Sequence, residues 1–236
     1  FITVLAAALF GMGCSSLDKG LVAYYPFNGN AEDESGNGNH GEIKGAILAV
    51  DRNGKSNSSY SFGGDDLIRA KHQDYLNTLP ITISIWFKTS DGETDHVGLV
   101  GKYLNASWVG YSVHMIKGVL HVDYLTGAPS ENSGQIGGVL ENCPKSKFIA
   151  DGKWHHMVCT VDSGNGILFV DGEQVSVKPW VGKSGVPITS WPLDIGLRED
   201  SRPEVKAVMM YFKGFLDDVR IYNRALSGEE VKALYD

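Results

Sequence analysis

The chain of 236 residues is poor in cysteine, with three, and in proline, with eight, and it contains no cluster of basic residues. Acidic side chains outnumber basic ones by 28 to 21, which gives a formal net charge of −7. Surfaces that bind nucleic acid need concentrated positive charge, so we expect no nucleic-acid partner. Hydrophobic residues make up 42% and charged residues 21%, both close to the globular norm. This composition excludes a wholly disordered chain and a membrane protein with several spans.

Glycine, in contrast, is abundant, with 29 residues against a usual share of about 7%. From Gly20 onward, short β-prone runs alternate with clusters of Gly, Asn, Asp and Ser. One run places Ile81, Ile83, Ile85 and Phe87 on the same face of a strand. Runs of this kind, separated by turns, predict an all-β fold of two antiparallel sheets packed as a sandwich. Further strands are expected at residues 21–27, 154–161, 167–170, 173–177 and 215–222.

Only the C-terminus predicts a helix. Ser227 followed by Glu230 is a capping box, in which each side chain satisfies a backbone N–H at the start of the helix. Val231, Leu234 and Tyr235 then form an apolar stripe. We expect a short helix docked on the sandwich.

The N-terminus begins with an apolar run at residues 1–12. The run is too short to cross a bilayer of about 30 Å as a helix and is typical of a secretory signal. It leads into Gly13-Cys14-Ser15-Ser16, which resembles a bacterial lipobox, although Gly11 stands where that family has Leu. The resemblance implies that Cys14 carries lipid in the mature protein, and the serines after it suit outer-membrane or surface sorting.

We therefore expect three parts. Residues 1–13 are a signal peptide that is truncated at its start, residues 14–19 are a lipidated tether, and residues 20–236 are one domain of an exported lipoprotein in a bacterial cell envelope. An ordinary signal peptide cleaved nearby and a core strand are the alternatives for residues 1–13.

The other two cysteines, Cys143 and Cys159, form an even pair in a chain expected to be exported. Such a pair predicts a disulfide. It would close a loop of roughly 15 residues and stabilise the fold by about 3 kcal/mol. Two free buried thiols are the alternative.

Three segments follow one another along the chain: residues 25–41 (YPFNGNAEDESGNGNHG), residues 154–158 (WHHMV) with residues 168–172 (LFVDG), and residues 212–227 (FKGFLDDVRIYNRALS). Together they resemble the concanavalin A-like jelly roll of the laminin-G-like (LamG-like) type. The resemblance implies two stacked antiparallel sheets, with an N-terminal strand paired to the last one. It also implies non-catalytic binding of a ligand or glycan, often with calcium.

The first of these segments places oxygen-bearing side chains at every second position, at Asp33, Ser35, Asn37 and Asn39, among glycines that permit a tight curl. Calcium takes six to eight oxygen ligands. Asp33, Ser35 and Asn37, together with Asn28, are therefore candidate calcium ligands. A plain Asn/Gly loop is the alternative.

A calcium site in a sandwich needs a further carboxylate, and the resemblance brings Asp217 and Asp218 to this region. Neighbouring residues of a strand face opposite sides, so only one of the two is expected to point at the ion. The ion would either support the fold or touch the ligand, and the alternative is that Asp217 lies on the surface.

A two-residue turn at Lys117-Gly118 would pair His114 with His121 and Ser112 with Asp123, all on one face of a hairpin. The opposite face is apolar. Histidine and aspartate are zinc ligand types, so a zinc site is one hypothesis. A polar ligand groove that includes His114 and His121, or a solvated sheet surface, are the others.

Three tryptophans lie in predicted loops, Trp108, Trp180 and Trp191. Aromatic rings in loops can stack on sugars, so these residues are candidate ligand contacts. The alternative is that each ring plugs an end of the sandwich. Trp86 and Trp154 lie within predicted strands, and we expect them in the core.

No Gly-x-Ser-x-Gly or His-Glu-x-x-His motif occurs. Jelly-roll glucanases carry their acids on one strand as Glu-x-Asp-x-x-Glu, and the nearest pattern, residues 93–98, lacks the third acid. We therefore expect a binding module for a glycan or polysaccharide, with calcium as a cofactor and with membrane contact only through Cys14. Alternatives are a domain that binds a surface protein, and a glycoside hydrolase or lyase with an unrecognised site.

Overall fold

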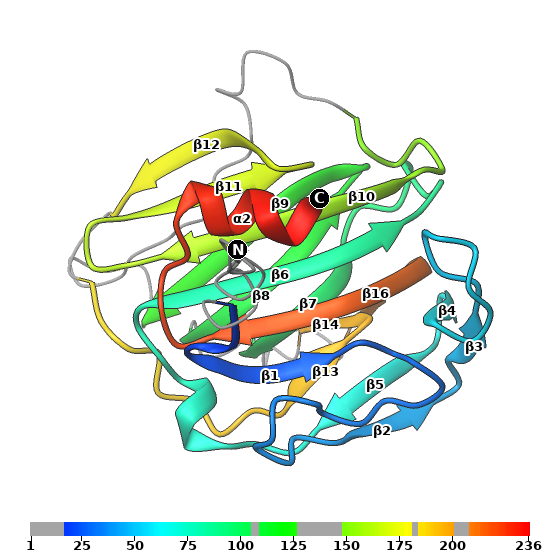
Figure 1. Cartoon of the computed structure of the whole chain (residues 1–236), viewed down its shortest axis with the longest axis horizontal. Coiled ribbons are helices and arrows are strands. Elements are labelled where there is room, and N and C mark those ends of the chain that lie inside the picture. Colours follow the sequence, from blue (N-terminus) through cyan, green and yellow to red (C-terminus); the bar gives the residue numbers. More distant parts are fainter. Residues whose placement is uncertain (1–16, 105–108, 127–147, 181–183, 201–207) are drawn as a thin grey trace, which may run out of the picture.

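The computed structural model describes residues 17–104, 109–126, 148–180, 184–200 and 208–236. They form two stacked eight-stranded sheets, with a short helix on the outside of one (Figure 1). Sheet A contains β1 (Leu21–Tyr25), β3 (Ile47–Ala49), β4 (Ser59–Gly63), β6 (Ile81–Lys88), β10 (Trp154–Val161), β11 (Asn165–Val170), β12 (Glu173–Pro179) and β16 (Lys213–Tyr222). Sheet B contains β2 (Gly41–Lys44), β5 (Leu67–Ala70), β7 (Val97–Leu104), β8 (Val109–Ile116), β9 (Val119–Thr126), β13 (Leu193–Ile195), β14 (Leu197–Asp200) and β15 (Val208–Tyr211). Helical elements include the 3-10 turn η1 (Asp74–Leu76) and α2 (Gly228–Tyr235).

The strand order of sheet A is β12-β11-β10-β6-β16-β4-β3, with β1 also paired to β16. In sheet B the order is β15-β14-β7-β13-β5-β2, and β8 pairs with both β7 and β9. Apart from a single parallel bridge between β14 and β7, the described pairs are antiparallel. These features confirm the predicted all-β sandwich and the pairing of an N-terminal strand with the last strand.

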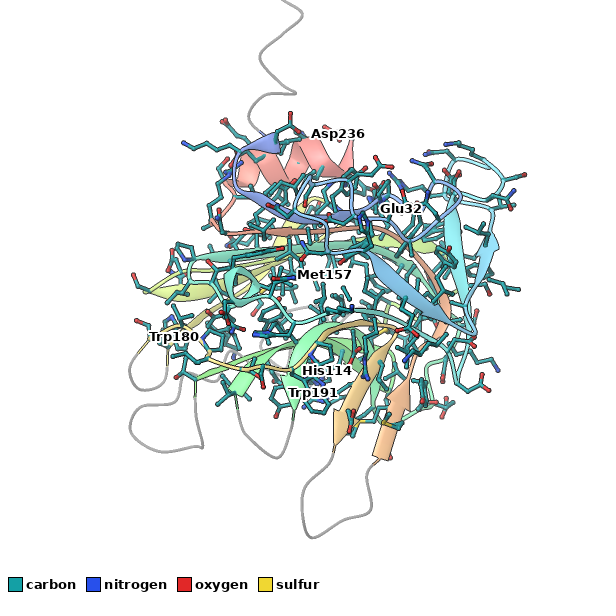
Figure 2. All side chains as sticks on the ribbon, turned by 90° about the horizontal axis from the view of Figure 1, so that it is seen from below. Glu32, His114, Met157, Trp180, Trp191 and Asp236 are labelled. Atoms are coloured by element: carbon teal, nitrogen blue, oxygen red, sulfur yellow. The ribbon has the colours of Figure 1, made fainter. Side chains whose placement is uncertain are left out.

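The core lies between the sheets, because one face of each strand is apolar. On β6, Ile81, Ile83, Ile85 and Phe87 are buried in this core, as the alternation of side chains along a strand requires. Met157 of β10 lies between the two layers, as Figure 2 shows. The face of each strand that points away from the other sheet is called its outer face below.

The hairpin of β8 and β9 forms as predicted. Lys117 and Gly118 both have positive φ, 48° and 75°, which is the geometry of a two-residue hairpin turn. His114 pairs with His121, and Ser112 pairs with Asp123. The predicted register is therefore confirmed.

Helix α2 packs on the outer face of sheet A. Ser227 and Glu230 make both hydrogen bonds of the predicted capping box. Val231 contributes to a second apolar cluster with Val158 of β10 and Phe169 of β11. The helix therefore covers an apolar part of the outer face that would otherwise meet water.

Next to α2 the outer face carries a stack of rings. Trp86 lies 4.8 Å from His156 and 5.5 Å from Tyr235 between ring centroids, and the Arg52 guanidinium lies 4.5 Å from the Trp86 ring. His156 Nε2 and Ser84 Oγ share a hydrogen bond of 2.8 Å. Trp86 is thus buried, as expected, and it lies on the outer face of sheet A rather than between the two sheets. Burial, with Arg220 and Arg52 nearby, lowers the pKa of His156 to about 3.

Cys159 lies in the middle of β10 as a free, buried thiol. The structure therefore gives no support to the predicted disulfide with Cys143, which itself lies outside the described residues, as does Cys14. The side chain of Cys159 packs into the core, and burial raises the pKa of its thiol to about 12. Chain spacing cannot reveal this, because a disulfide and a small buried thiol suit the same position in a strand.

Among the helices of the described ranges, none has the length and apolar character needed to span a bilayer.

We predict that Cys159 is unreactive in the folded protein, because its thiol is buried and protonated. In a Cys14→Ser, Cys143→Ser variant, a thiol reagent such as Ellman's reagent should label one group only after unfolding in guanidinium. The wild-type protein should unfold at the same temperature with and without reductant. A higher unfolding temperature without reductant would contradict a free Cys159.

The depressed pKa of His156 predicts a loss of stability in acid. The unfolded chain binds a proton at this residue below about pH 6.5, whereas the folded protein does so only near pH 3, so protonation favours unfolding as the pH falls between these values. As the pH falls, the unfolding free energy of the wild type should therefore decrease relative to that of His156→Gln, by up to about 1.4 kcal/mol per pH unit. Urea titrations from pH 7 to 4 measure it. For the exposed, non-titrating control Val177→Ala, the difference should stay constant, and a constant difference for His156→Gln would disprove the assignment.

Candidate functional site

An open cleft of about 1150 Å³ lies at one end of the sandwich. It is larger than the roughly 300–1,000 Å³ of typical small-molecule pockets, which leaves room for several linked units. One wall of the cleft consists of the ends of β4 and β6 and the start of β16. The edge strand β15 forms a second wall, and the turn after β6 completes the cleft. The lining residues are 61–64, 88–91, 94–96, 209–211 and 213–215.

Phe215 is one of the apolar residues that line this cleft. It is partly exposed and pairs with Lys88 on β6 and with the small Ser61 on β4. The Lys88 ammonium lies 5.5 Å from the centroid of the Phe215 ring. Trp154, opposite Lys88 on β10, contacts Phe215 at 6.3 Å between ring centroids. Trp154 therefore lies on the outer face of sheet A, which corrects our expectation that it is a core residue.

The turn after β6 supplies polar groups to the cleft. Thr89 Oγ1 donates a hydrogen bond to the Lys213 carbonyl, which fixes this turn to the start of β16. Asp91 accepts hydrogen bonds from the backbone N–H groups of Glu93 and Thr94 and from the Thr94 hydroxyl. Although partial burial acts to raise it, these bonds hold the pKa of Asp91 below its usual value.

His96 connects the cleft to the outer face of sheet B. Its ring lies 6.0 Å from that of His114, which lies 5.3 Å from that of His121. Arg198 Nη1 donates to His114 Nδ1 at 2.7 Å and to Asp123 Oδ2 at 2.8 Å. Burial and the charge of Arg198 lower the pKa of His114. Within the described residues, no three His, Cys, Asp or Glu side chains are placed to hold a metal ion, so the geometry gives no support to the zinc hypothesis.

The candidate calcium ligand Asp33 is already surrounded by hydrogen-bond donors. Its carboxylate accepts from the backbone N–H groups of Tyr24, Ser35 and Asn39, and from the side chains of Ser35 and Asn39. These bonds hold the pKa of Asp33 down, although burial acts to raise it. Donors rather than oxygen ligands thus face the carboxylate, an arrangement that does not fit a bound cation.

The other candidates in the loop also form hydrogen bonds to the protein. The Ser35 hydroxyl and the Asn37 side chain both donate to the Val22 carbonyl. Asn28 Oδ1 accepts from Lys55 Nζ at 2.6 Å. The loop is therefore closed by its own hydrogen bonds, and calcium as its support stays a prediction.

Asp217 and Asp218 both point to one partner. The two terminal nitrogens of Arg52 contact one carboxylate each, at 2.6 Å. A bulge in β16 and a φ of 47° at Asp218 turn both side chains to the outer face. The expectation that only one of them can face a common site is therefore wrong, because it assumed regular alternation.

Asp218 also contacts the N-terminal strand β1, because its carboxylate accepts a hydrogen bond from the Tyr24 hydroxyl. Burial and the charge of Asp218 raise the pKa of Asp217 to about 7, while Arg52 acts to lower it. The Arg52 guanidinium thus pairs with both of the carboxylates that the calcium hypothesis offered as alternative ligands.

The three tryptophans predicted as ligand contacts have different outcomes. Trp180 Nε1 donates to the Asp162 carbonyl at 2.6 Å, and its ring meets Tyr124 edge to face, so it closes an end of the sandwich. Trp191 is partly buried, and its buried Nε1 has no hydrogen-bond partner. Trp108 lies outside the described residues. Neither of the two described tryptophans lines the cleft.

The cleft residues Lys88, Phe215 and Lys213 escaped the sequence analysis. Phe215 was identified only as part of a strand, because nothing local distinguishes it from other outer-face residues. One signal was available in the sequence. Lys213, Phe215 and Asp217 occupy every second position of the strand, so they share the face opposite to the buried Leu216.

Two stacked antiparallel sheets with an open cleft at their end define a lectin-type β-sandwich. The chain belongs to the concanavalin A-like lectin/glucanases superfamily, whose model matches residues 62–232. No curated protein matches the chain.

Solved structures share the fold at low sequence identity. The binding domain of Paraclostridial Mosquitocidal Protein 1 is 20% identical, with a TM-score of 0.70, over 93% of this chain and 52% of that one. A structure of botulinum neurotoxin type C, described by its dependence on two ganglioside molecules for cell entry, is 15% identical, with a TM-score of 0.65, over 94% and 52%. The chain therefore spans about half the length of these toxin structures.

Domain 4 of AbnA, an extracellular arabinanase from Geobacillus stearothermophilus, was solved in complex with arabinotriose. It is 21% identical to this chain, with a TM-score of 0.61, over 92% of this chain and 98% of that one. At these identities the likeness shows a common fold only.

The donors around Asp33 predict that calcium does not act through this residue. Asp33→Ala leaves several buried donors without an acceptor, which should cost about 3 kcal/mol of unfolding free energy. The loss should be the same in millimolar calcium and in EDTA, as measured by urea denaturation. Glu34→Ala, at an exposed position of the same loop, is the control and should change stability little. If Asp33→Ala destabilised the protein only in calcium, Asp33 would be a calcium ligand after all.

Proposed function

We propose that the chain is a carbohydrate-binding module that holds an oligosaccharide in the end cleft without cleaving it. The carrying observation is the partly exposed Phe215 ring in an open cleft bordered by polar groups. Sugars present apolar faces and a rim of hydroxyls, so they suit a ring with hydrogen-bonding neighbours. The arabinotriose complex and the ganglioside-dependent toxin, which have the same fold, support this proposal.

The carboxylates that line the cleft favour binding over hydrolysis. A glycosidase needs a carboxylic acid with a raised pKa to protonate the leaving oxygen. Asp91 has a lowered pKa and accepts hydrogen bonds within its own turn. Asp95 pairs with Lys117 at 3.2 Å. Neither carboxylate is prepared to act as a general acid.

The proposal extends to the location of the protein. Export to a bacterial cell envelope, with lipid on Cys14, would present the cleft to extracellular glycans. A protein partner is the second candidate, because a botulinum neurotoxin binding domain of similar fold was solved in complex with rat synaptotagmin II.

A glycan array of neutral and acidic oligosaccharides that includes arabinotriose tests the proposal. Phe215→Ala should weaken the best interaction by about tenfold or more, which corresponds to roughly 1.4 kcal/mol. Ile188→Ala is the control, because Ile188 is 85% exposed and lies outside the cleft. Release of reducing ends would instead establish an enzyme. Folded protein that binds no glycan on the array would favour the protein partner.

A further inference from the structure

We infer that the sugar bound in the cleft carries a negatively charged group, a carboxylate or a sulfate, and that Lys88 and Lys213 bind this group. The inference rests on the proposed function, because it specifies the ligand class of the same cleft.

The first observation is the position of the two lysines on either side of Phe215. Lys88 is the β6 partner of Phe215, and Lys213 lies two residues before it on β16, so all three side chains share the outer face of sheet A. Lys213 pairs with Gly63 on β4. All of these residues line the cleft. A sugar on the ring would thus lie within reach of two ammonium groups.

The second observation is the charge balance. Within the described parts of the chain, neither lysine lies within salt-bridge distance of a carboxylate. The Lys88 ammonium contacts the face of Phe215 instead. Of the two acids that line the cleft, Asp91 is saturated by its own turn and Asp95 is paired with Lys117. The formal charges of the lining therefore balance, with two lysines against Asp91 and Asp95, and the charge of Lys213 contributes to the lowered pKa of Asp91. Because both acids are engaged by other groups, the two ammonium groups, which form no salt bridge with the described residues, are the charged groups of the cleft available to a ligand.

An anionic group between two ammonium groups gains from both charges, and the partly sheltered position of Lys88 weakens solvent screening. Lys213 is exposed, so its share of the attraction depends on salt. A neutral sugar would keep the contact with Phe215 but leave both charges unused. The cleft should therefore prefer the acidic member of two sugars with the same backbone.

The test uses matched pairs of oligosaccharides on the full chain. One pair is an oligogalacturonate and its carboxyl-reduced form, and the other is a chondroitin sulfate oligosaccharide and its desulfated form. Titration calorimetry at 50 mM and 500 mM NaCl should show at least tenfold tighter binding of one acidic member than of its neutral partner, and a smaller preference at high salt. The pair that responds tells a carboxylate from a sulfate.

The variants Lys88→Gln, Lys213→Gln and their double should bind the acidic and the neutral member of the responding pair with equal affinity. Lys153→Gln, a surface lysine outside the cleft, is the charge control, and Lys88→Arg should retain the preference. If the Lys88 variants fail to fold, Lys213→Gln decides alone, since its side chain is exposed.

Equal binding of acidic and neutral members, or a preference that survives the lysine variants, would overturn the inference while leaving the proposed function intact. If folded protein binds none of the four probes and no glycan on the array, the proposed function itself fails.

Discussion

The structure depends on the pairing of β16 with three neighbours at once. This ten-residue strand hydrogen-bonds to β6 along one edge and to β1 and β4 along the other. Its inner side chains, among them Leu216, Val219 and Ile221, belong to the core. Its outer side chains carry the cleft at one end and the contacts to Arg52 in the middle. The last strand of the chain is therefore the one that joins the start of the chain, the core and the candidate site. Figure 1 shows β16 between β6 and β1.

The parts of the fold that follow from local rules were predictable. A hairpin turn fixes register, so Lys117-Gly118 determined that His114 faces His121. Ser227 and Glu230 satisfy each other's backbone groups within one turn of helix, and this needs no tertiary context. The buried face of β6 follows from the period of two along a strand.

The candidate site was not predictable in the same way. The cleft is made from the ends of strands that are far apart in the sequence, so no segment contains its pattern. Regular alternation along a strand made Asp217 and Asp218 look like alternatives. The bulge in β16 breaks this alternation and turns both side chains to Arg52. Asp33 was assigned to an ion from residue types, their spacing and a resemblance, whereas its hydrogen-bond donors come from the folded loop and from Tyr24. In each case residue type suggested a chemistry, and only the neighbours decide whether the residue performs it.

The pairing of β1 with β16 has a mechanical consequence. Leu21, at the start of β1, lies beside Tyr222 at the end of β16, whereas the cleft lies at the start of β16, roughly 25–30 Å away along the strand. A pull between the start of β1 and a ligand in the cleft would act parallel to these strands. The ladder hydrogen bonds of β1, β16 and β6 would then be loaded together in shear instead of opening one after another. A module that holds its ligand at one end and is attached at the other would thus resist tension along its strongest direction.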